Sequence, residues 1–489
     1  MRREPSLTRY VGGIFYETIK VFSKSTILGY GVAGIGNAIP AGLFYVYFIF
    51  FLTTVAGINP AIAGSISLIA VLWDAINDPM VGFWTDNCKS KYGRRRPFVI
   101  GGLLPLTVVI ILMFTNLNMP LNFKTAWFIL LNILFWFFFT FVDVPMIALG
   151  DALNTNYDNK TKCRTAWTVL MMCGSVLGES LPPAIIDFID SKVNNVSLSW
   201  FIMICVLALI TFLAYFIAWN ATRGREVIPK LEKTQGMKYS FFKEYLAAFR
   251  NKGMRFSMPG VALVYCGFNG AAVPTMAFIC TFNLGLPDAQ VTLYLLAYTV
   301  GSILGSLCLG TISAKFGKKL GGKSKEIAYA FGVYAIASII CFFVGTNHVT
   351  VLICLFLLGF TCSAFFLHGW NLALDAAKIE QYKTGEEKGG IYTAMIGFCF
   401  KVGGAIGMWL VGLLLAAYGF DETQTVQSES ALHGIEITFF LVTGIVLLLA
   451  CIILFRNPMT RHKMDCLLEA LDKKEKGEAI DESGFSDLL

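Results

Sequence analysis

Long apolar runs separated by short polar stretches recur along almost the whole chain. An α-helix needs about 17–25 mostly apolar residues to cross the hydrocarbon core of a bilayer. Runs of this length predict about twelve membrane-spanning helices. They lie at residues 28–53, 60–84, 97–116, 125–150, 165–188, 199–219, 255–283, 290–314, 325–345, 349–377, 389–418 and 434–456.

The composition agrees with this pattern. The chain of 489 residues is 56% hydrophobic and 15% charged, with a mean hydropathy of +0.65. A soluble chain would carry about 25% charged residues. The predicted fold class is therefore an all-α multi-pass membrane protein. Its 13 cysteines are scattered without a CxxC or Cys/His cluster, so they indicate neither a metal centre nor a disulfide framework.

The basic residues predict the orientation in the membrane, because Lys and Arg accumulate on the cytoplasmic side. They gather in the loops after the second, sixth and eighth runs, at 89–96, 223–255 and 315–325. Both termini are therefore expected in the cytoplasm, and the expected location is the cell membrane. The net charge of +7 reflects this bias and is no indication of nucleic-acid binding.

One long polar interruption, at 220–254, divides the runs six and six. A weak internal repeat accompanies it, since Gly93–Arg94–Arg95 follows the second run and Gly317–Lys318–Lys319 follows the eighth. Secondary transporters are commonly built from two such halves, with the binding site between them. The predicted domains are a cytoplasmic segment 1–27, a six-helix bundle 28–219, a linker 220–254, a second six-helix bundle 255–456 and a cytoplasmic tail 457–489.

Two polar segments have helical spacing of their own. SFFKEYLAAF in the linker is expected to form a surface helix joining the bundles. MDCLLEALDKKEKGEAI in the tail is helix-like and charged, and we expect it to be solvated. The tail carries no motif for a partner protein.

Two carboxylates fall inside an otherwise apolar run. Asp74 and Asp78 are four residues apart, so they share one helix face, with Asn77 beside it. Charged groups in a bilayer are costly and usually face a cavity or a partner. Carboxylate and amide oxygens suit a hard cation. A proton alone would need only one carboxylate, so the presence of two favours a monovalent metal ion, sodium. The alternative is a structural pair at the helix end, solvated or bridged to Arg94–Arg96.

Lys401 is the only basic residue that we place well inside a predicted span. An ammonium group there needs an anion, which the second span offers. The alternative is that its side chain extends to the membrane interface. If Asp74 and Asp78 are both ionised, Lys401 and one bound cation bring their sum to zero. Loss of the cation would unbalance the cluster, which could couple ion binding to the inward–outward transition.

Several sequence blocks carry a resemblance to a known family. WDAINDP at 73–79 is followed by KSKYGRRRPF at 89–98, and FTFVDVP at 139–145 and KGGIYTAMIGFCFKVGG at 388–404 occur further on. Together they resemble the glycoside–pentoside–hexuronide:cation symporters, the melibiose permease branch of the major facilitator superfamily. The resemblance covers the whole chain and implies a twelve-helix fold of two six-helix bundles that alternates between outward- and inward-open states.

The resemblance also implies functional residues. Cation binding falls on Asp74, Asn77, Asp78 and Thr140, and Lys401 would link that site to the interface between the bundles. All four oxygen-bearing positions match the family's sodium-using pattern. Sodium is therefore the expected coupling ion, with a proton or lithium as alternatives. No other cofactor is implied.

The match is weaker at the positions that bind sugar in the family. The aspartate of span 4 is Asp143, but the other three positions read Ala38, Ile147 and Met171. An unpaired buried polar group costs about 1–3 kcal/mol, so a pocket with fewer partners should recognise sugars differently. The remaining polar or stacking candidates are Asn37, Tyr45, Glu179, Asn269, His368, Trp370, Asn371 and Asp375.

Some of these candidates have structural alternatives. Tyr45 is more typical of a packed aromatic than of a ring that stacks on substrate. His368 and Glu179 suit interhelical hydrogen bonds. Asp143, one turn from Thr140, is the best candidate for reaching both substrate and cation. If it is ionised, the charge sum becomes −1, so either it is protonated or the substrate supplies a cation or a strong donor.

Three functions fit these observations. The first is a sodium-coupled symporter of a glycoside or hexuronide, and the second is a carrier of an amphiphilic or lipid-like substrate on the same fold. The third is a non-transporting sensor or scaffold, against which the complete cation set counts. No catalytic triad, metal cluster or phosphate loop indicates an enzyme. The expected partners are a small-molecule substrate and the membrane, with no nucleic acid and no obligate partner protein.

Overall fold

The computed structural model describes residues 24–88, 90, 93–153, 157–224, 250–385, 389–476 and 478–489. Within these residues every regular element is a helix or a helical turn. The N-terminal residues 1–23 and the surface helix that we predict in the linker lie outside the described residues. The all-helical architecture confirms the predicted fold class.

The number of spans agrees with the hydropathy pattern. In the described part of the chain, 11 helices are long and apolar enough to cross a membrane, and one bent pair makes up to 12. The pair joins Lys162–Ser180 to Pro182–Val193 at an angle of 48°. Pro182 and Pro183 cause the break, because they lack the N–H groups that would continue the hydrogen bonds of the preceding turn. The single run that we predict at 165–188 is therefore a broken helix.

The chain folds into two compact units, and each unit is built from two separate segments of the sequence. Unit 1 contains residues 1–44 and 76–234, and unit 2 contains 45–75 and 235–489. The helix α4 (Pro60–Asn87) belongs to unit 2 in its first part and to unit 1 from residue 76. The domain boundaries predicted from the sequence stay a prediction.

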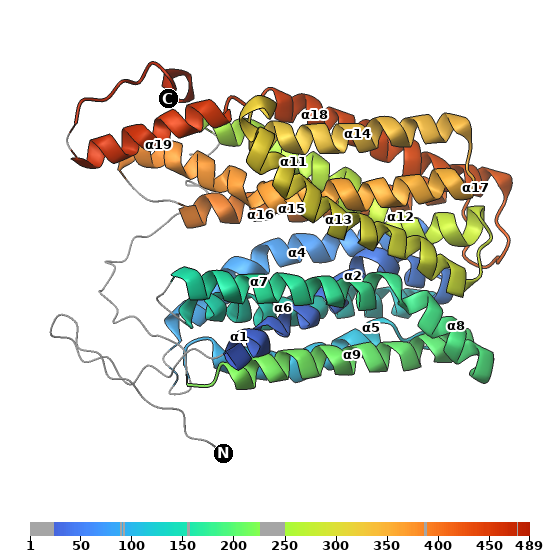
Figure 1. Ribbon diagram of the computed structural model, residues 1–489. Coiled ribbons are helices and arrows are strands. Elements are labelled where there is room, and N and C mark those ends of the chain that lie inside the picture. Colours follow the sequence, from blue (N-terminus) through green and yellow to red (C-terminus); the bar gives the residue numbers. More distant parts are fainter. Residues whose placement is uncertain are drawn as a thin grey trace. The chain divides into compact units, whose positions relative to one another are not determined.

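Unit 1 is a bundle in which α2 packs against α7 and α9, while α5 packs against α6 and α9 (Figure 1). Besides the end of α4, its helices are α1 (Lys24–Gly31), α2 (Ala33–Gly42), α5 (Arg96–Met113), α6 (Leu121–Ala152), α7 (Tyr157–Ser175), the π-helical turn η3 (Val176–Ser180), α8 (Pro182–Val193) and α9 (Val196–Ala221). Arg96 at the start of α5 donates hydrogen bonds to the Trp219 carbonyl and to Thr222 at the end of α9. The start of α5 is thereby fastened to the end of α9.

Unit 2 contains the remaining elements. Its first elements are η1 (Leu43–Tyr47), which begins at the boundary with unit 1, α3 (Phe48–Phe50), η2 (Phe51–Val55) and the first part of α4. The later ones are α11 (Lys252–Tyr265), η4 (Cys266–Ala272), α12 (Val273–Phe278), η5 (Ile279–Asn283), α13 (Asp288–Leu320), α14 (Lys323–Val344), α15 (His348–Thr384), α16 (Gly389–Ala417), α17 (Glu429–Glu436), η6 (Ile437–Val442), α18 (Thr443–Phe455), α19 (Arg461–Lys476) and η7 (Ser486–Leu488). Figure 1 shows α14 beside α18, and α15 packs against α13, α14 and α16.

A close backbone approach holds α13 against α15. A Cβ atom added to Gly359 of α15 would lie 1.9 Å from the Tyr298 carbonyl oxygen of α13, well inside van der Waals contact. Only glycine therefore fits at this crossing. The contact sets the position of the later part of α15 relative to α13 and α14, where several polar side chains meet.

The C-terminal segment differs from our expectation of a solvated tail. One face of α19 is buried, since Leu467 is 0% exposed, and Phe485 and Leu488 further on are also 0% exposed. Phe485 packs edge-to-face on Tyr382 of α15 at 5.2 Å between ring centroids. The Tyr382 hydroxyl donates a 2.6 Å hydrogen bond to Glu482. Apolar side chains at helical spacing thus dock the segment on α15, so the expectation was wrong for this face.

Candidate cation and substrate site

The predicted intramembrane ion pair forms inside unit 2. Asp74 of α4 is 0% exposed, and its Oδ2 lies 2.5 Å from Nζ of Lys401 on α16. The two helices approach closely earlier along α4, where a Cβ atom added to Gly412 would lie 2.3 Å from the Pro60 carbonyl oxygen. This packing brings together two charges that are far apart in the sequence. Its role in coupling stays a prediction.

The later part of α4 meets α6 inside unit 1 through two polar contacts. The Thr140 hydroxyl donates a 3.0 Å hydrogen bond to Oδ1 of Asp78. One residue earlier, the amide nitrogen of Asn77 donates to the Trp136 carbonyl oxygen at 3.1 Å. Trp136 and Thr140 are one turn apart on α6, so one face of α6 receives both side chains.

The second atom of the Asn77 amide lacks a partner. Asn77 is 0% exposed, and its Oδ1 is buried and accepts no hydrogen bond from any described residue. A buried acceptor left unpaired costs about 1–3 kcal/mol. A bound cation would remove this cost, because an amide carbonyl, carboxylates and a hydroxyl are the oxygen ligands that hard cations take. Within unit 1, the oxygen atoms of Asn77, Asp78 and Thr140 are therefore of the kind that a hard cation takes.

The carboxylate predicted to face substrate takes part in a hydrogen-bonded chain across three helices of unit 1. The hydroxyl of Tyr215 on α9 donates to Oδ1 of Asp143 on α6 at 2.8 Å. The Asn37 side chain of α2 makes a second hydrogen bond to the same hydroxyl. Both Tyr215 and Asp143 are buried. The structure thus connects two predicted residues, Asn37 and Asp143, through one that sequence reasoning missed.

Tyr215 left only a weak signal in the sequence. It stands in TFLAYFIAW, a stretch of a predicted span whose other residues are almost all apolar. A tyrosine in such a position usually packs by its ring, so nothing marked its hydroxyl as a partner for Asp143, which is 72 residues away. A buried tyrosine hydroxyl does need a hydrogen-bond partner, and that need was the available clue.

Two of the apolar positions lie in helix packing. A Cβ atom added to Gly174 of α7 would lie 2.9 Å from the Cβ of Ala38 on α2. A Cβ atom added to Gly34 would lie 3.2 Å from the Cβ of Met171. Small residues at 34 and 174 therefore let α2 and α7 pack closely around Ala38 and Met171.

Two further residues of unit 1, Ile147 and Glu179, were predicted to bind substrate. Ile147 of α6 is partly exposed. Glu179 lies in the turn η3, where it forms a hydrogen bond with Ser175 and packs against Gly42 of α2. Neither residue is joined to Asp143 by a contact that the structure describes.

The aromatic candidates belong to unit 2. Tyr45 is partly buried in the turn η1. Trp370 of α15 is 43% exposed and packs edge-on against Phe400 at 4.7 Å between ring centroids. Asn269 is 8% exposed, and its Nδ2 donates no hydrogen bond to any residue that the structure describes. None of the three is linked to the others by a described contact.

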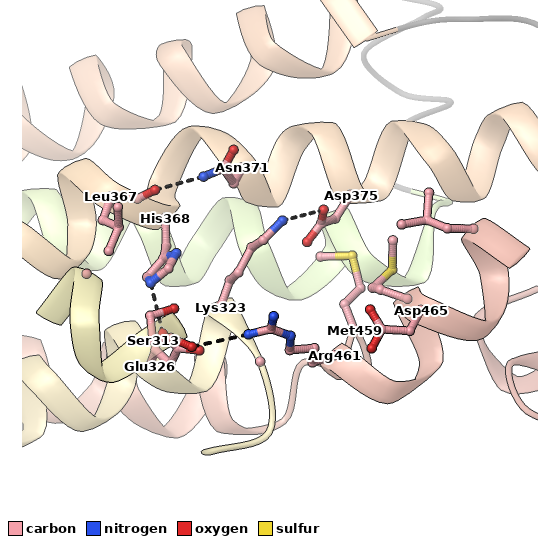
Figure 2. A pocket seen from close by; sticks show the side chains of 14 residues that line it. Ser313, Lys323, Glu326, Leu367, His368, Asn371, Asp375, Met459, Arg461 and Asp465 are labelled. Carbon is pink, nitrogen blue, oxygen red and sulfur yellow. Dashed lines mark hydrogen bonds and ion pairs between the residues drawn. The ribbon is translucent and has the colours of Figure 1, made fainter. Parts of the chain in front are cut away.

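The last polar candidates are engaged elsewhere in unit 2. Nε2 of His368 on α15 lies 2.9 Å from Oε2 of Glu326 on α14, so the expected interhelical contact of His368 is confirmed. Asp375 pairs with Lys323 of α14 at 2.7 Å. Asn371 donates to the Leu367 carbonyl of its own helix. These side chains line a cavity of their own (Figure 2).

Comparisons with known proteins agree with the fold. The family model described as MFS/sugar transport protein matches residues 29–461. The inner membrane symporter YicJ of Escherichia coli (strain K12) is 25% identical over 461 residues, which cover 92% of this chain and 95% of that protein. The isoprimeverose transporter of Lactiplantibacillus pentosus is 22% identical over 457 residues, which cover 89% of each.

A solved structure shows the same fold. It is a bacterial homologue of the human lysosomal transporter Spinster, with a TM-score of 0.64, 11% identity, and coverage of 90% of this chain and 97% of the other. The family match spans nearly the whole chain and confirms the resemblance to the cation symporters of glycosides, pentosides and hexuronides. The chain therefore belongs to the MFS/sugar transport proteins, a family of multi-pass membrane transporters and not of enzymes.

Proposed function

We propose that the protein is a sodium-coupled symporter that moves a glycoside, a hexuronide or a related small solute by alternating access. We also propose that it resides in the cell membrane with both termini in the cytoplasm. The observation that carries the proposal is the buried Oδ1 of Asn77, unpaired among the described residues and adjacent to the contact between Asp78 and Thr140. The names of the relatives, a symporter and an isoprimeverose transporter, support the class of solute.

Sodium would be held by Asp74, Asn77, Asp78 and Thr140. The ion supplies one positive charge to a group of oxygen atoms that are costly to bury uncompensated. On the protein side, Lys401 neutralises Asp74, while the hydroxyl of Thr140 orients Asp78 without balancing its charge. Binding of the ion therefore completes the neutralisation of the two carboxylates on α4. This is the physical basis that we propose for coupling.

Asp143 would bind the solute. Tyr215 fixes one of its carboxylate oxygens, which gives the group a defined direction toward a sugar hydroxyl. Asp143 lies one turn after Thr140 on α6, so movement of this helix on cation binding would reach both. A solute rich in hydroxyl donors suits a carboxylate, a tyrosine hydroxyl and an amide better than an acyl chain would.

An amphiphilic substrate is less favoured. That alternative depends on the apolar residues at positions that bind sugar in the family. Ala38 is buried in the contact between α2 and α7, and the Cβ of Met171 lies at the same contact. Ala38 is therefore not part of a continuous apolar surface for a lipid chain.

Thermal unfolding of the purified protein tests the cation site. We would compare sodium, lithium and choline chloride at matched ionic strength, for the wild type and for Asp78→Asn. Sodium at ten times its Kd should stabilise the wild type by about 1.4 kcal/mol, and the mutant should lose this response. The exposed Asp187 on α8 offers a matched control, because Asp187→Asn removes a carboxylate that is not part of the proposed site and should keep the response. Identical unfolding curves in all three salts would contradict the proposal.

A further inference from the structure

A polar cavity inside unit 2 is separate from the proposed cation and substrate residues. It has a volume of about 430 Å³ and lies between the later part of α13, the start of α14, the later part of α15 and the start of α19 (Figure 2). Its charged and titratable lining residues are Lys323 and Glu326 of α14, His368 and Asp375 of α15, and Arg461 and Asp465 of α19. From α13 the lining residues are Gly310 and Ser313, which carry no charge.

Three contacts connect these helices, as Figure 2 shows. His368 pairs with Glu326 at 2.9 Å, and the two side chains are only 7% and 8% exposed. Lys323 pairs with Asp375 at 2.7 Å. Arg461 donates to the Ser313 carbonyl oxygen at 3.2 Å. The cluster therefore fastens α14 to α15 and α19 to α13.

The α13 backbone closes one side of the cluster. A Cβ atom added to Gly317 would lie 2.5 Å from the Arg461 guanidinium and 2.9 Å from Glu326 Oε1. The α13 backbone therefore lies directly beside the charged ends of Glu326 and Arg461.

The contact with Glu326 determines the hydrogen positions on a neutral His368. An ionised carboxylate only accepts hydrogen bonds, so Nε2 of His368 must carry the hydrogen. The other nitrogen, Nδ1, then presents a lone pair. It is buried and has no hydrogen-bond partner among the described residues. An unpaired buried nitrogen on the wall of a polar cavity is placed to accept a proton from water there.

The charges around the cavity favour this proton. Lys323 and Arg461 contribute two positive charges, and Glu326, Asp375 and Asp465 contribute three negative ones, so a neutral His368 leaves a sum of −1. One proton on His368 brings the sum to zero. Glu326 and Asp375 are the anionic groups that interact electrostatically with the imidazole. The side chains of Glu326 and His368 are the most buried of the paired groups, and a buried charge is costly unless it is compensated.

We propose that the pair of His368 and Glu326 is a proton-binding site, separate from the sodium site. Water in the cavity delivers one proton to Nδ1, the imidazole becomes imidazolium, and Nε2–H stays on Glu326. Histidine is the side chain that changes charge between about pH 5 and 8. The protonated pair holds α14 to α15 more tightly, so proton uptake makes the stability of unit 2 depend on the pH at the cavity.

Hydrogen–deuterium exchange at the C2 carbon of histidine tests the site directly. The full-length protein would be measured in choline chloride without sodium, between about pH 5 and 9, and each histidine followed by mass spectrometry. His433 is a matched control, because its Nδ1 lies 3.3 Å from Glu436 but its side chain is 55% exposed. We expect His368 to exchange more slowly than His433 and to show a titration step. Glu326→Gln should move that step and leave the exchange of His433 unchanged.

Two results would overturn the proposal. One is the absence of any titration step of His368 in this range, and the other is a step that Glu326→Gln does not move. The measurement on the wild type decides the first even if the variant fails to fold. Because sodium is absent throughout, the outcome does not depend on the proposed symport.

A stability profile gives a second readout. The stability of the wild type and of His433→Gln should change with pH across this range. The stability of His368→Gln should change less, while its response to sodium stays intact. A His368→Gln profile identical to that of the wild type would count against the site.

Discussion

Replacement of Lys401 by methionine is the most informative single perturbation of the ion pair. Asp74 is 0% exposed, and its carboxylate lies 2.5 Å from the Lys401 ammonium group. Removal of one partner of a buried pair typically destabilises a protein by about 3–5 kcal/mol, because the other charge stays buried without compensation. Methionine has nearly the same length and flexibility as lysine, so lost packing should contribute little.

A double-mutant cycle isolates the pairwise part of this cost. We would measure the free energy of unfolding of Lys401→Met, Asp74→Asn and the double variant in the same detergent without sodium. The side chain of Lys401 is 21% exposed and that of Asp74 only 1%, so the charge that Asp74→Asn leaves is the less buried one, and this variant should cost less than Lys401→Met. The double variant should recover stability relative to Lys401→Met, with a coupling energy near 3 kcal/mol, about the upper end of measured pairs.

The exposed pair of Asp472 and Lys476 on α19 provides the control. Its side chains are 63% and 58% exposed, so its coupling energy should be indistinguishable from zero. A coupling energy between Asp74 and Lys401 as small as that of the control pair would refute the reasoning. It would mean that Asp74 is neutral, or that water reaches it once Lys401 is removed.

Three further predictions concern other parts of the molecule. Tyr215→Phe removes the donor to Asp143 and should lower stability by about 1–3 kcal/mol and weaken solute-induced protection in thermal unfolding, while the response to sodium remains. Deletion of residues 478–489 uncovers the apolar surface that they bury on α15 and α19, so the unfolding temperature should fall, and an unchanged temperature would show that the segment does not dock. Gly359→Ala should cost about 1–3 kcal/mol by overpacking against α13, whereas Gly310→Ala, with no atom within 4 Å of its added Cβ, should be neutral or stabilising in the same denaturation assay.

Hydropathy was sufficient for the fold because each span must bury its own backbone hydrogen bonds in lipid. The hydropathy pattern did not predict the break before Pro182, because a bent helix and a straight helix have the same apolar composition. It also misjudged the C-terminal segment. The charges of α19 suggested solvation, and the burial of Leu467 depends on a surface of unit 2 that no local pattern contains.

Some site residues could be predicted from the sequence, and their partners could not. Asp74 and Lys401 could be singled out because charges are rare in spans, and rarity is a property of the sequence alone. Partners are different, since they depend on which helices meet. Glu326 lies at the start of its helix, where charge is common, so its contact with His368 could not be foreseen. Tyr215 was overlooked because a tyrosine in an apolar stretch usually packs by its ring.

Direct measurement of sodium binding tests the central claim most closely. We would titrate the purified protein with radioactive sodium in a choline background, for the wild type, Asp78→Asn and Asp187→Asn. The account predicts saturable binding to the wild type and to Asp187→Asn, and none to Asp78→Asn. Binding to Asp78→Asn equal to that of the wild type, or no saturable binding to any of the three, would contradict a sodium site built on α4 and α6.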